Sequence, residues 1–311
     1  MNNKLKIMKK YLVTGGAGFI ASHLVDQLIL EGNEVIILDN LSTGKEENIN
    51  KKAKFYNLDI CDFEKIKPLF KGVDGVFHLA AIPSVPFSVE NPILTSNVNI
   101  MGTINVFKAS VEHGIKRVVF ASSSAVYGNQ KTLPFKESMQ SNPVSPYGLQ
   151  KLVGEQFAKV FCDLYNIQIV CMRYFNVYGP RVDVNSDYSL VLGKFLKLYQ
   201  EGKPLTIYGD GKQTRGFCYV LDVVNANIKA MESDKVKGFE VFNISDKGSS
   251  SVKDLAKLIG GEVVYLPKRK GDPLHTKADI SRAKKIIGWQ PNVDFKEGVV
   301  LTREWFKNIR L

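Results

Sequence analysis

A glycine-rich turn near the start of the chain limits the possible folds more than any other stretch. The apolar run Tyr11-Leu12-Val13-Thr14 predicts a short buried strand, and Gly15-Gly16-Ala17-Gly18-Phe19-Ile20-Ala21 follows it, before an amphipathic segment at 22–30. Glycine at position 15 allows a tight turn, glycine at 18 lets a pyrophosphate approach the backbone, and alanine at 21 allows close packing of helix on strand. The pattern therefore predicts a strand, a turn and a helix that together bind a dinucleotide.

A carboxylate at the end of the next predicted strand indicates which dinucleotide is bound. The strand is expected at 34–38, and Asp39 follows it, 21 residues after Gly18. In dinucleotide-binding α/β units a carboxylate at this point accepts hydrogen bonds from the adenosine ribose. Because a negative charge would repel the 2′-phosphate of NADP, the pattern favours NAD.

Strands and helices continue to alternate along the first half of the chain. Further strands are expected at 55–58, 75–79, 117–121 and 168–173, and helices at 62–70, 91–113 and 145–165. This alternation predicts an α/β protein of the Rossmann type, with a doubly wound parallel sheet mainly at 1–175, to which a segment at about 215–245 returns. Residues 176–311 are expected to form mainly a smaller α/β substrate-binding lobe. Its predicted elements are helices at 189–201, 252–259, 281–287 and 295–309, strands at 205–208 and 262–266, and an extended piece at 215–219.

Polar and small residues follow several predicted strands at the edge where a doubly wound sheet binds its ligand. Asp59-Ile60, Leu79-Ala80-Ala81 and Ser122-Ser123-Ser124 each stand at a strand's carboxyl end, so we expect them to border the cofactor. His78 lies within an apolar strand. A core histidine is the favoured interpretation there, ahead of a catalytic one.

One helix carries a tyrosine and a lysine that can share a site. Ser145 is a good N-cap and Pro146 suits the first helical position, so the helix begins just before Tyr147. Tyr147 and Lys151 stand four residues apart and therefore lie on one helix face. The spacing alone is too common to indicate a function. An apolar stripe with helical period predicts packing of this helix against the sheet: Val153, Phe157, Val160, Phe161 and Leu164.

Composition excludes several classes of protein. The chain has 311 residues, 44% of them hydrophobic, and no apolar run approaches the roughly 20 residues that span a membrane. The basic segment 1–10 leads into the glycine loop and contains no signal cleavage site, so a cytoplasmic location is expected. The four cysteines lack metal-ligand spacing, and no metal is predicted. The net charge of +11 permits nucleic-acid binding, but the basic clusters at 4–10 and 268–270 lack interleaved aromatic residues, so none is expected.

Taken together, these motifs resemble those of the extended short-chain dehydrogenase/reductase family, the NAD-dependent nucleotide-sugar epimerases and dehydratases. The resemblance rests on Thr14 to Ile20, Asp39-Asn40, His78 to Ala81, Ser122 to Ser124, Tyr147-x-x-x-Lys151 and Arg173 to Pro180, with further matches at 210–215, 219–223, 269–272 and 278–281. It covers nearly the whole chain. The motifs in this order are far more specific than any one of them.

The resemblance implies a role for individual residues. Tyr147, Lys151 and Ser123 are the implied catalytic residues, with Ser122 and Ser124 as alternatives to Ser123. The implied cofactor-binding residues are Gly15, Gly18, Phe19, Ile20, Asp39, Asn40, Asp59, Ile60, Leu79, Ala80, Ala81, Asn99, Ser122, Tyr147, Lys151 and Tyr174. The implied substrate-binding residues are Ser123, Ser124, Asn176, Arg215, Arg269, Asp272 and Thr276.

The residues before Val126-Tyr127-Gly128 separate reactions within the family. Dehydratases of this family carry an Asp-Glu pair there and decarboxylases a Glu, whereas this chain has Ser124-Ala125. Without an acid for elimination, the sequence looks like a UDP-hexose 4-epimerase, an isomerase that oxidises and re-reduces the sugar at C4. In that mechanism Lys151 and the nicotinamide stabilise the Tyr147 phenolate, which takes the 4-hydroxyl proton while Ser123 holds the same oxygen.

Two positions bear on the substrate. Thr276 resembles a gate beside the sugar's C2 substituent, and threonine leaves room for an N-acetyl group, so UDP-GlcNAc and UDP-GalNAc are expected substrates besides UDP-glucose and UDP-galactose. Gly216 stands where the family usually has Asp, which leaves the support of Arg215 open.

Three alternatives remain open. The chain could be a UDP-glucuronate 4-epimerase, a GDP- or dTDP-sugar reductase, or a non-catalytic protein that binds NAD or nucleic acid. A homodimer, formed through the Tyr147 helix and the 91–113 helix, is a further expectation from the resemblance.

Overall fold

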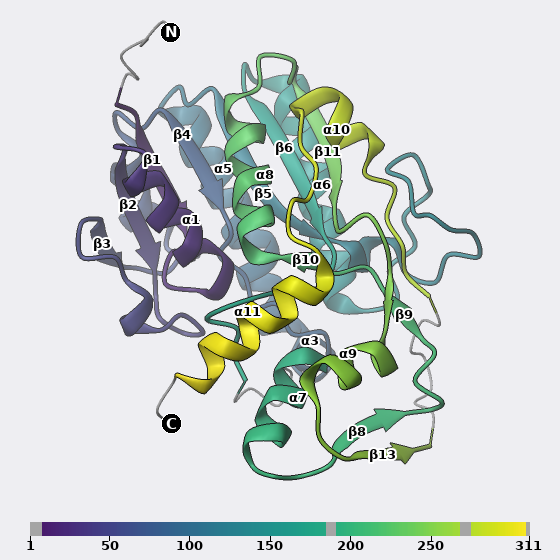
Figure 1. The fold of residues 1–311 in the computed structure, drawn as a ribbon. Helices are drawn as coiled ribbons and strands as arrows, with labels where there is room; N and C mark the ends of the chain where they lie inside the picture. The colour runs from purple at the N-terminus through teal and green to yellow at the C-terminus, as the bar shows by residue number, and fades with distance from the viewer. Residues whose placement is uncertain (1–7, 185–190, 268–274, 309–311) are drawn as a thin grey trace, which may run out of the picture.

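The computed structural model describes residues 8–184, 191–267 and 275–308 (Figure 1). A seven-stranded parallel sheet forms its centre, in the order β11-β6-β5-β4-β1-β2-β3. The strands are β1 (Lys10–Thr14), β2 (Glu34–Asp39), β3 (Lys54–Asn57), β4 (Gly75–His78), β5 (Arg117–Ser123), β6 (Gln168–Tyr174) and β11 (Phe239–Ile244). The order reverses at β1, beside which β2 and β4 pair on opposite sides. The predicted doubly wound α/β fold is confirmed.

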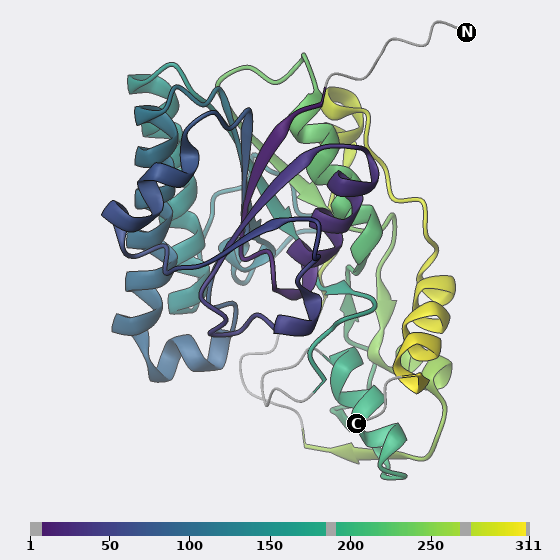
Figure 2. The same cartoon turned by 90° about the vertical axis from the view of Figure 1, so that its left-hand side faces the viewer.

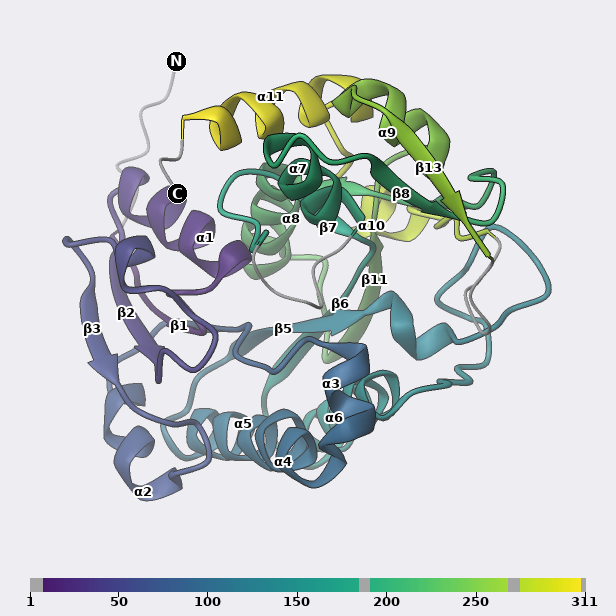
Figure 3. The ribbon, with the colours of Figure 1, turned by 90° about the horizontal axis from the view of Figure 1, so that it is seen from below.

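Helices cover both faces of this sheet, and Figures 2 and 3 separate the two layers. One face packs against α1 (Phe19–Leu30), α8 (Val220–Glu232) and α10 (Ser281–Ile287), and the other against α2 (Phe63–Ile66), α5 (Thr103–Glu112) and α6 (Pro146–Leu164). Alternate strand residues enter the two cores, as the two-residue period of a strand requires. Val13 of β1 joins the α1 side, whereas Leu12 joins the α5 side.

A smaller group of elements packs below the carboxyl edge of the sheet, as Figure 1 shows. It comprises α7 (Val191–Gln200), β8 (Leu205–Tyr208), α9 (Val252–Ile259), β13 (Val263–Leu266) and α11 (Phe295–Lys307). Their apolar faces share one core that includes Phe195, Ile207 and Leu255. Short strand pairs join this group to the sheet: β7 (Val177–Tyr178) with β10 (Cys218–Tyr219), and β9 (Thr214–Arg215) with β12 (Ser250–Ser251).

The segment expected to be one helix at 91–113 is helical without interruption from Pro92 to Glu112, but its middle is π-helical. It consists of α4 (Pro92–Ser96), a π-helical segment η3 (Asn97–Gly102) and α5, and a further helix, α3 (Val85–Glu90), precedes it. A π-helical segment widens the backbone and often marks a functional position. Here it places Asn99 inside the protein, fully buried.

The prediction that the apolar stripe of α6 packs on the sheet holds for Phe161, which is buried, and for Phe157, which packs partly buried against the same core, but it is wrong for Val160 and Leu164. Apart from Phe161, the buried residues of α6 are small or polar: Gly148, Gln150, Lys151, Gly154, Glu155 and Ala158. Gly154 shows the reason, because a Cβ there would lie 2.7 Å from Cζ of Phe120. Val160 and Leu164 remain outside this close contact and are 48% and 69% exposed.

Candidate active site

The glycine turn lies where the ends of β1, β2 and β4 meet. Gly15 has φ +73°, and a Cβ there would lie 2.8 Å from the amide nitrogen of Ala80. A Cβ at Gly18 would lie 3.0 Å from the carbonyl oxygen of Gly15. Helix α1 begins at Phe19 without a side-chain cap. The turn therefore keeps open the space before a helix N-terminus, which suits the pyrophosphate of a dinucleotide.

Asp39 is held by the backbone on both sides of its carboxylate. Oδ2 accepts a hydrogen bond from the Ala17 N–H (3.0 Å), and Oδ1 accepts one from the Leu41 N–H (2.8 Å). Next to it, Asn40 Nδ2 donates to Asp59 Oδ2 at 3.0 Å. Since each carboxylate oxygen has a second lone pair, Asp39 can still accept from ribose hydroxyls. These residues fit an adenosine ribose at the end of β2.

His78 is a structural residue within a directed chain of hydrogen bonds. On one side, the Ala80 N–H donates to Thr14 Oγ1 at 3.1 Å, and this oxygen lies 2.7 Å from His78 Nδ1. On the other side, His78 Nε2 lies 3.0 Å from Thr103 Oγ1, and the Thr103 hydroxyl donates to the Asn99 carbonyl at 2.7 Å. This order makes Nδ1 the acceptor and Nε2 the donor. Burial and the charge of Lys151 lower the pKa of His78 to about 3, so the ring is neutral. The interpretation as a core histidine is confirmed.

Asn99 ties the loop after β4 to α6. Its Oδ1 accepts from the Ile82 N–H (2.8 Å), and Nδ2 donates to the Ile82 carbonyl (3.1 Å) and to Gln150 Oε1 (2.8 Å). Gln150 lies between Tyr147 and Lys151 in the sequence and is itself buried. The amide of Asn99 is therefore engaged with protein groups, and it positions the loop at 79–82 that we expect to line the cofactor.

The N-terminus of α6 forms as predicted. Ser145 Oγ accepts the Gly148 N–H at 3.1 Å, Pro146 occupies the first turn, and Ser88 Oγ accepts the Tyr147 N–H at 3.1 Å. The first turn is therefore held by the N-cap Ser145 and by Ser88 of helix α3. This fixes the backbone that carries Tyr147.

Close packing brings Tyr147 toward Ser123. A Cβ at Gly148 would lie 2.6 Å from the carbonyl oxygen of Ala125, in the 3-10 turn η4 (Ser124–Tyr127). Ser123 caps this turn, since its Oγ accepts the Ala125 N–H at 3.1 Å. The Ser123 side chain lies near enough to the Tyr147 phenol to act on the pKa of that phenol. The two hydroxyls can thus hold one substrate oxygen.

Burial opposes charge on both members of the Tyr147–Lys151 pair. Although Tyr147 is only partly buried as a residue, desolvation of its hydroxyl raises its pKa to about 12, and the Ser123 hydroxyl offsets part of that rise. Burial lowers the pKa of Lys151 to about 8. Its Nζ donates to the Ala121 carbonyl at 2.8 Å and lies 5.9 Å from the Tyr147 ring centroid. A basic phenolate therefore requires a further positive charge, such as an oxidised nicotinamide.

The other two serines of the motif differ from Ser123. Ser122 is buried and its Oγ donates to Glu155 Oε1 at 2.5 Å, whereas Ser124 is partly exposed and begins the η4 turn. Tyr174 also turns inward, and its hydroxyl donates to Asn227 of α8 at 2.8 Å. The polar groups of Ser122 and Tyr174 are thus engaged within the protein. Sequence reasoning missed Glu155, although its position four residues after Lys151 places it on the same helix face.

Three of the expected substrate residues meet around Gly216. Asn176 Nδ2 donates to the Gly216 carbonyl (2.7 Å), and the Gly216 N–H donates to Thr276 Oγ1 (3.2 Å). Arg215 precedes this glycine in β9. A Cβ at Gly216 would lie 2.7 Å from Ser245 Oγ, so Ser245 occupies the space that an aspartate at this position would need. Arg269 and Asp272 lie outside the described residues.

Within residues 8–184, 191–267 and 275–308, no group of three or more His, Cys, Asp or Glu side chains could hold a metal ion. In that part of the chain, no helix has both the length and the apolar character needed to cross a membrane.

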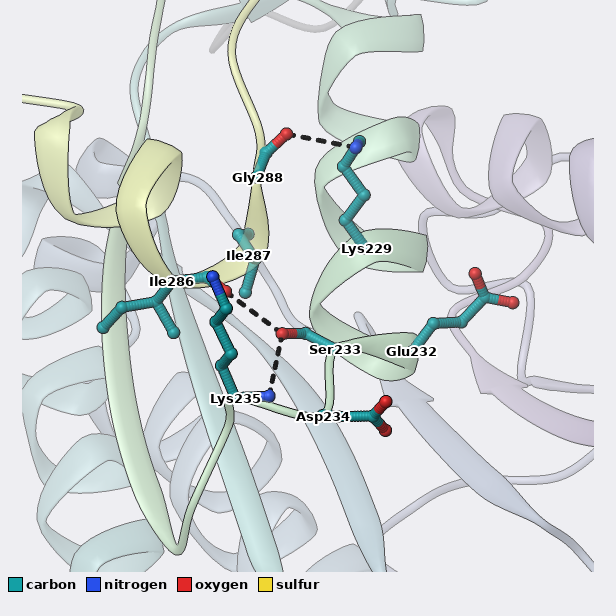
Figure 4. Close-up of a pocket in the computed structure, with 8 residues that line it drawn as sticks. All are labelled: Lys229, Glu232, Ser233, Asp234, Lys235, Ile286, Ile287 and Gly288. Carbon is teal, nitrogen blue, oxygen red and sulfur yellow. Dashed lines mark hydrogen bonds between the residues drawn. The ribbon is translucent and has the colours of Figure 1, made fainter.

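The cavity in Figure 4 lies at the opposite edge of the sheet, between the ends of α8 and α10. Its polar groups connect these two elements: Lys229 Nζ donates to the Gly288 carbonyl at 3.1 Å, and Ser233 Oγ donates to the Ile286 carbonyl at 3.1 Å. Figure 4 draws both bonds. We interpret this cavity as part of the packing of α10 on α8.

The fold and these contacts define a dinucleotide-binding α/β protein with a candidate acid–base centre at the carboxyl edge of its sheet. Residues 11–245 match the family described as the NAD dependent epimerase/dehydratase family, and the chain belongs to it. A putative UDP-glucose 4-epimerase from Methanocaldococcus jannaschii is 43% identical over 307 residues, which cover 96% of this chain and 98% of the relative.

Solved structures agree in fold. The UDP-glucose 4-epimerase of Thermotoga maritima, solved with UDP-glucose, is 40% identical, covers 96% of this chain and 98% of its own, and has a TM-score of 0.91. The UDP-N-acetylglucosamine 4-epimerase of Methanobrevibacter ruminantium, in complex with UDP-N-acetylmuramic acid, is 41% identical with the same coverage and a TM-score of 0.92.

Relatives that act on UDP-glucuronate also occur. The UDP-glucuronic acid 4-epimerase of Bacillus cereus, in complex with UDP-glucuronic acid and NAD, is 33% identical, covers 96% of this chain and 99% of its own, and has a TM-score of 0.88. UDP-glucuronic acid decarboxylase 1 of Xenopus tropicalis is 34% identical over 313 residues, which cover 97% of this chain and 73% of the relative. This protein is thus an NAD-dependent member of a family of UDP-sugar enzymes.

Proposed function

We propose that this protein is a UDP-hexose 4-epimerase that interconverts UDP-glucose with UDP-galactose, and UDP-GlcNAc with UDP-GalNAc. The observation that supports this most is the placement of Tyr147 one helical turn from buried Lys151, whose Nζ lies 5.9 Å from the tyrosine ring and is held by the Ala121 carbonyl, beside Ser123 at the end of β5. The η4 turn beside them has Ser124-Ala125 and no carboxyl group for elimination or decarboxylation. Oxidation and re-reduction of one carbinol needs no such group.

The residues of this chain divide the work in that reaction. Bound NAD supplies the hydride acceptor for the first half and the hydride donor for the second. Tyr147 takes the proton from the sugar 4-hydroxyl, Ser123 donates a hydrogen bond to the same oxygen as it becomes a carbonyl, and Lys151 stabilises the phenolate. Tyr147 later returns the proton. The glycine turn, with Gly15 and Gly18, and Asp39 would hold NAD.

The 4-keto sugar must turn its other face to the site before it is reduced again. This turn requires a firm hold on the diphosphate and a loose hold on the hexose. Asn176 and Arg215, together with Arg269, are the proposed anchors, and Thr276 leaves space beside C2. Thr276→Tyr should reduce turnover of the N-acetylated pair more than that of UDP-glucose. Thr276→Ser, which keeps the hydroxyl that accepts the Gly216 N–H, should not.

We further propose a homodimer formed by the outer faces of α3, α4 and α6. These helices expose apolar side chains in the single chain: Val89 60%, Ile93 87%, Leu94 51%, Leu149 51%, Val160 48% and Leu164 69%. A second copy with the same patch would cover them around a two-fold axis. Sedimentation should give the mass of a dimer, and Leu164→Glu should shift it toward the monomer.

A product assay tests the reaction and the substrate together. The purified protein is incubated without added cofactor with UDP-glucose, UDP-GlcNAc, UDP-glucuronate, a GDP-sugar and a dTDP-sugar, and products are identified by NMR. Tyr147→Phe should lower epimerisation by about 100-fold or more while bound NAD is retained. Tyr165→Phe, at the exposed C-terminus of the same helix, is the matched control. Release of CO₂, turnover of UDP-glucuronate alone, or full activity of Tyr147→Phe would contradict the proposal.

A further inference from the structure

Glu155 is a buried carboxylate on the helix face that carries Tyr147 and Lys151. It follows Lys151 by four residues and Tyr147 by eight, so the three side chains lie one above another on α6. Only 3% of Glu155 is exposed. A carboxylate out of water is costly unless it is paired and hydrogen-bonded, so the partners of Glu155 indicate its role.

Its partners come from two neighbouring strands. Ser122 of β5 donates from Oγ to Glu155 Oε1 at 2.5 Å. Arg173 of β6 donates from Nε to Oε1 at 2.9 Å and from Nη2 to Oε2 at 2.6 Å. Ser122 and Arg173 face each other in the β5–β6 register. One carboxylate therefore fastens the carboxyl ends of both strands to the catalytic helix through short, charge-assisted hydrogen bonds.

The residues that follow these strand ends belong to the site. Ser123 follows Ser122 directly, and the segment 174–176 follows Arg173. We propose that Glu155 is a positioning residue, which sets the distance from Ser123 to Tyr147 and the place of the 174–176 segment for the epimerisation proposed above. This inference rests on that proposed function and assigns Glu155 no contact with the substrate.

Arg173 has little freedom to find another partner. Its guanidinium carbon lies 4.6 Å from the ring centroid of Tyr127, and its Nη2 lies 3.4 Å from Ser141 Oγ. Tyr127 is fixed in turn, because its hydroxyl donates to Asn243 at 2.6 Å. The Nη1 atom of Arg173 is buried and has no hydrogen-bond partner among the described residues. Glu155 is thus the anion against which this arginine is held.

A purely structural ion pair would contribute stability without setting the geometry of the site. Two sets of variants distinguish these roles. Ser122→Ala removes a single hydrogen bond to Glu155 and leaves the ion pair intact. Ser110→Ala is its matched control, since Ser110 is also buried and donates one hydrogen bond, to the Val106 carbonyl of α5 at 2.7 Å.

The serine variants should differ in turnover and agree in stability. Ser122→Ala is expected to lower kcat by about 3- to 10-fold, the effect of one hydrogen bond, with KM for the UDP-sugar unchanged. Ser110→Ala should keep kcat, and both variants should lose a similar amount of thermal stability. Equal kcat values for the two variants would overturn the proposal.

The second set replaces the ion pair by apolar side chains of similar volume. Glu155→Met alone leaves Arg173 buried without a counterion and should unfold at a lower temperature than the wild type. The double variant Glu155→Met with Arg173→Met should regain most of that stability. Its kcat should stay roughly 10-fold or more below the wild type, because the strand ends are no longer fastened to α6. Recovery of kcat together with stability would show a structural role only.

A crystallographic measurement keeps this inference separate from the proposed reaction. If the wild type epimerises no sugar of the panel, the proposed function fails, and the role of Glu155 is then decided by the separation of Ser123 Oγ from Tyr147 Oη in the double variant and the wild type. A longer separation in the double variant supports positioning by Glu155. An unchanged separation overturns it.

Discussion

Replacing Gly148 by alanine tests whether close packing of α6 sets the active geometry. The added Cβ would lie 2.6 Å from the carbonyl oxygen of Ala125 and 3.2 Å from Cβ of Pro143. Carbon and oxygen atoms in contact need about 3.4 Å, so helix and η4 turn must separate by roughly 0.8 Å. Tyr147 precedes this glycine and Ser123 caps the turn, so the same movement draws the two hydroxyls apart.

The expected effects on stability and turnover differ in size. Alanine is the better helix former by about 1 kcal/mol, and overpacking costs about 1–3 kcal/mol, so Gly148→Ala should lower the free energy of unfolding by no more than about 2 kcal/mol. A misplacement near 1 Å at reacting groups can cost about 100-fold in rate. We therefore expect kcat to fall by roughly 10- to 100-fold, with little change in KM.

Initial rates at saturating UDP-sugar and a thermal scan measure both quantities. Gly154→Ala is the control, because its Cβ would meet the tip of the Phe120 ring at a similar distance, 2.7 Å, but away from the η4 turn. It should lose stability and keep more of its turnover than Gly148→Ala. Wild-type kcat in Gly148→Ala, or an equal loss in the control, would refute the argument.

Three further predictions concern charge and packing. Burial lowers the pKa of Lys151 from 10.5 to about 8, so burial of its ammonium reduces the free energy of unfolding by about 3 kcal/mol at pH 7. The Lys151→Met variant should therefore be inactive, and without NAD it should be more stable to urea than the wild type by up to that amount. Because the unfolded chain holds more protons between pH 8 and 10.5, wild-type stability should rise across that window, and a variant with the same rise would exclude Lys151 as its source. The Asp39→Ala variant loses the carboxylate that accepts two backbone N–H groups, and it should bind NAD about 10- to 100-fold more weakly. The purified variant should then release less NAD on denaturation than the wild type does, and full occupancy by NAD would contradict the prediction. Gly216→Ala, whose Cβ would lie 2.7 Å from Ser245 Oγ, should raise KM for the UDP-sugar, and Ser245→Gly added to it should restore KM; no restoration would mean that the contact is not the cause.

Features with local causes were predictable from the sequence. The glycine turn follows from the conformational freedom of Gly15, and the start of α6 follows from the Ser145 cap and Pro146. Each signal lies within a few residues of the structure it determines. Asp39, at the end of the second strand, was found for the same reason.

Features caused by distant residues were not predictable. The inward face of α6 includes Lys151 and Glu155 because they belong to the site and its support, whereas the apolar side chains of Val160 and Leu164 stay outside, against the usual rule for an amphipathic helix. The π-helical segment depends on the hydrogen bonds of Asn99 with Ile82 and Gln150. The need for glycine at position 216 depends on Ser245, 29 positions later, which occupies the space beside it. Such pairings appear only once the strands are in register.

The place of β11 in the sheet has a consequence for synthesis on the ribosome. Among the strands of the described residues, β11 pairs with β6 alone, and about 70 residues separate the end of β6 from the end of β11. At 5–20 residues per second, roughly 4–14 s pass in which one edge of β6 has no partner. An apolar strand with an open edge invites pairing with other chains. A nascent chain stalled or cut after residue 175 should therefore aggregate, although it already contains Tyr147, Lys151 and the whole glycine turn.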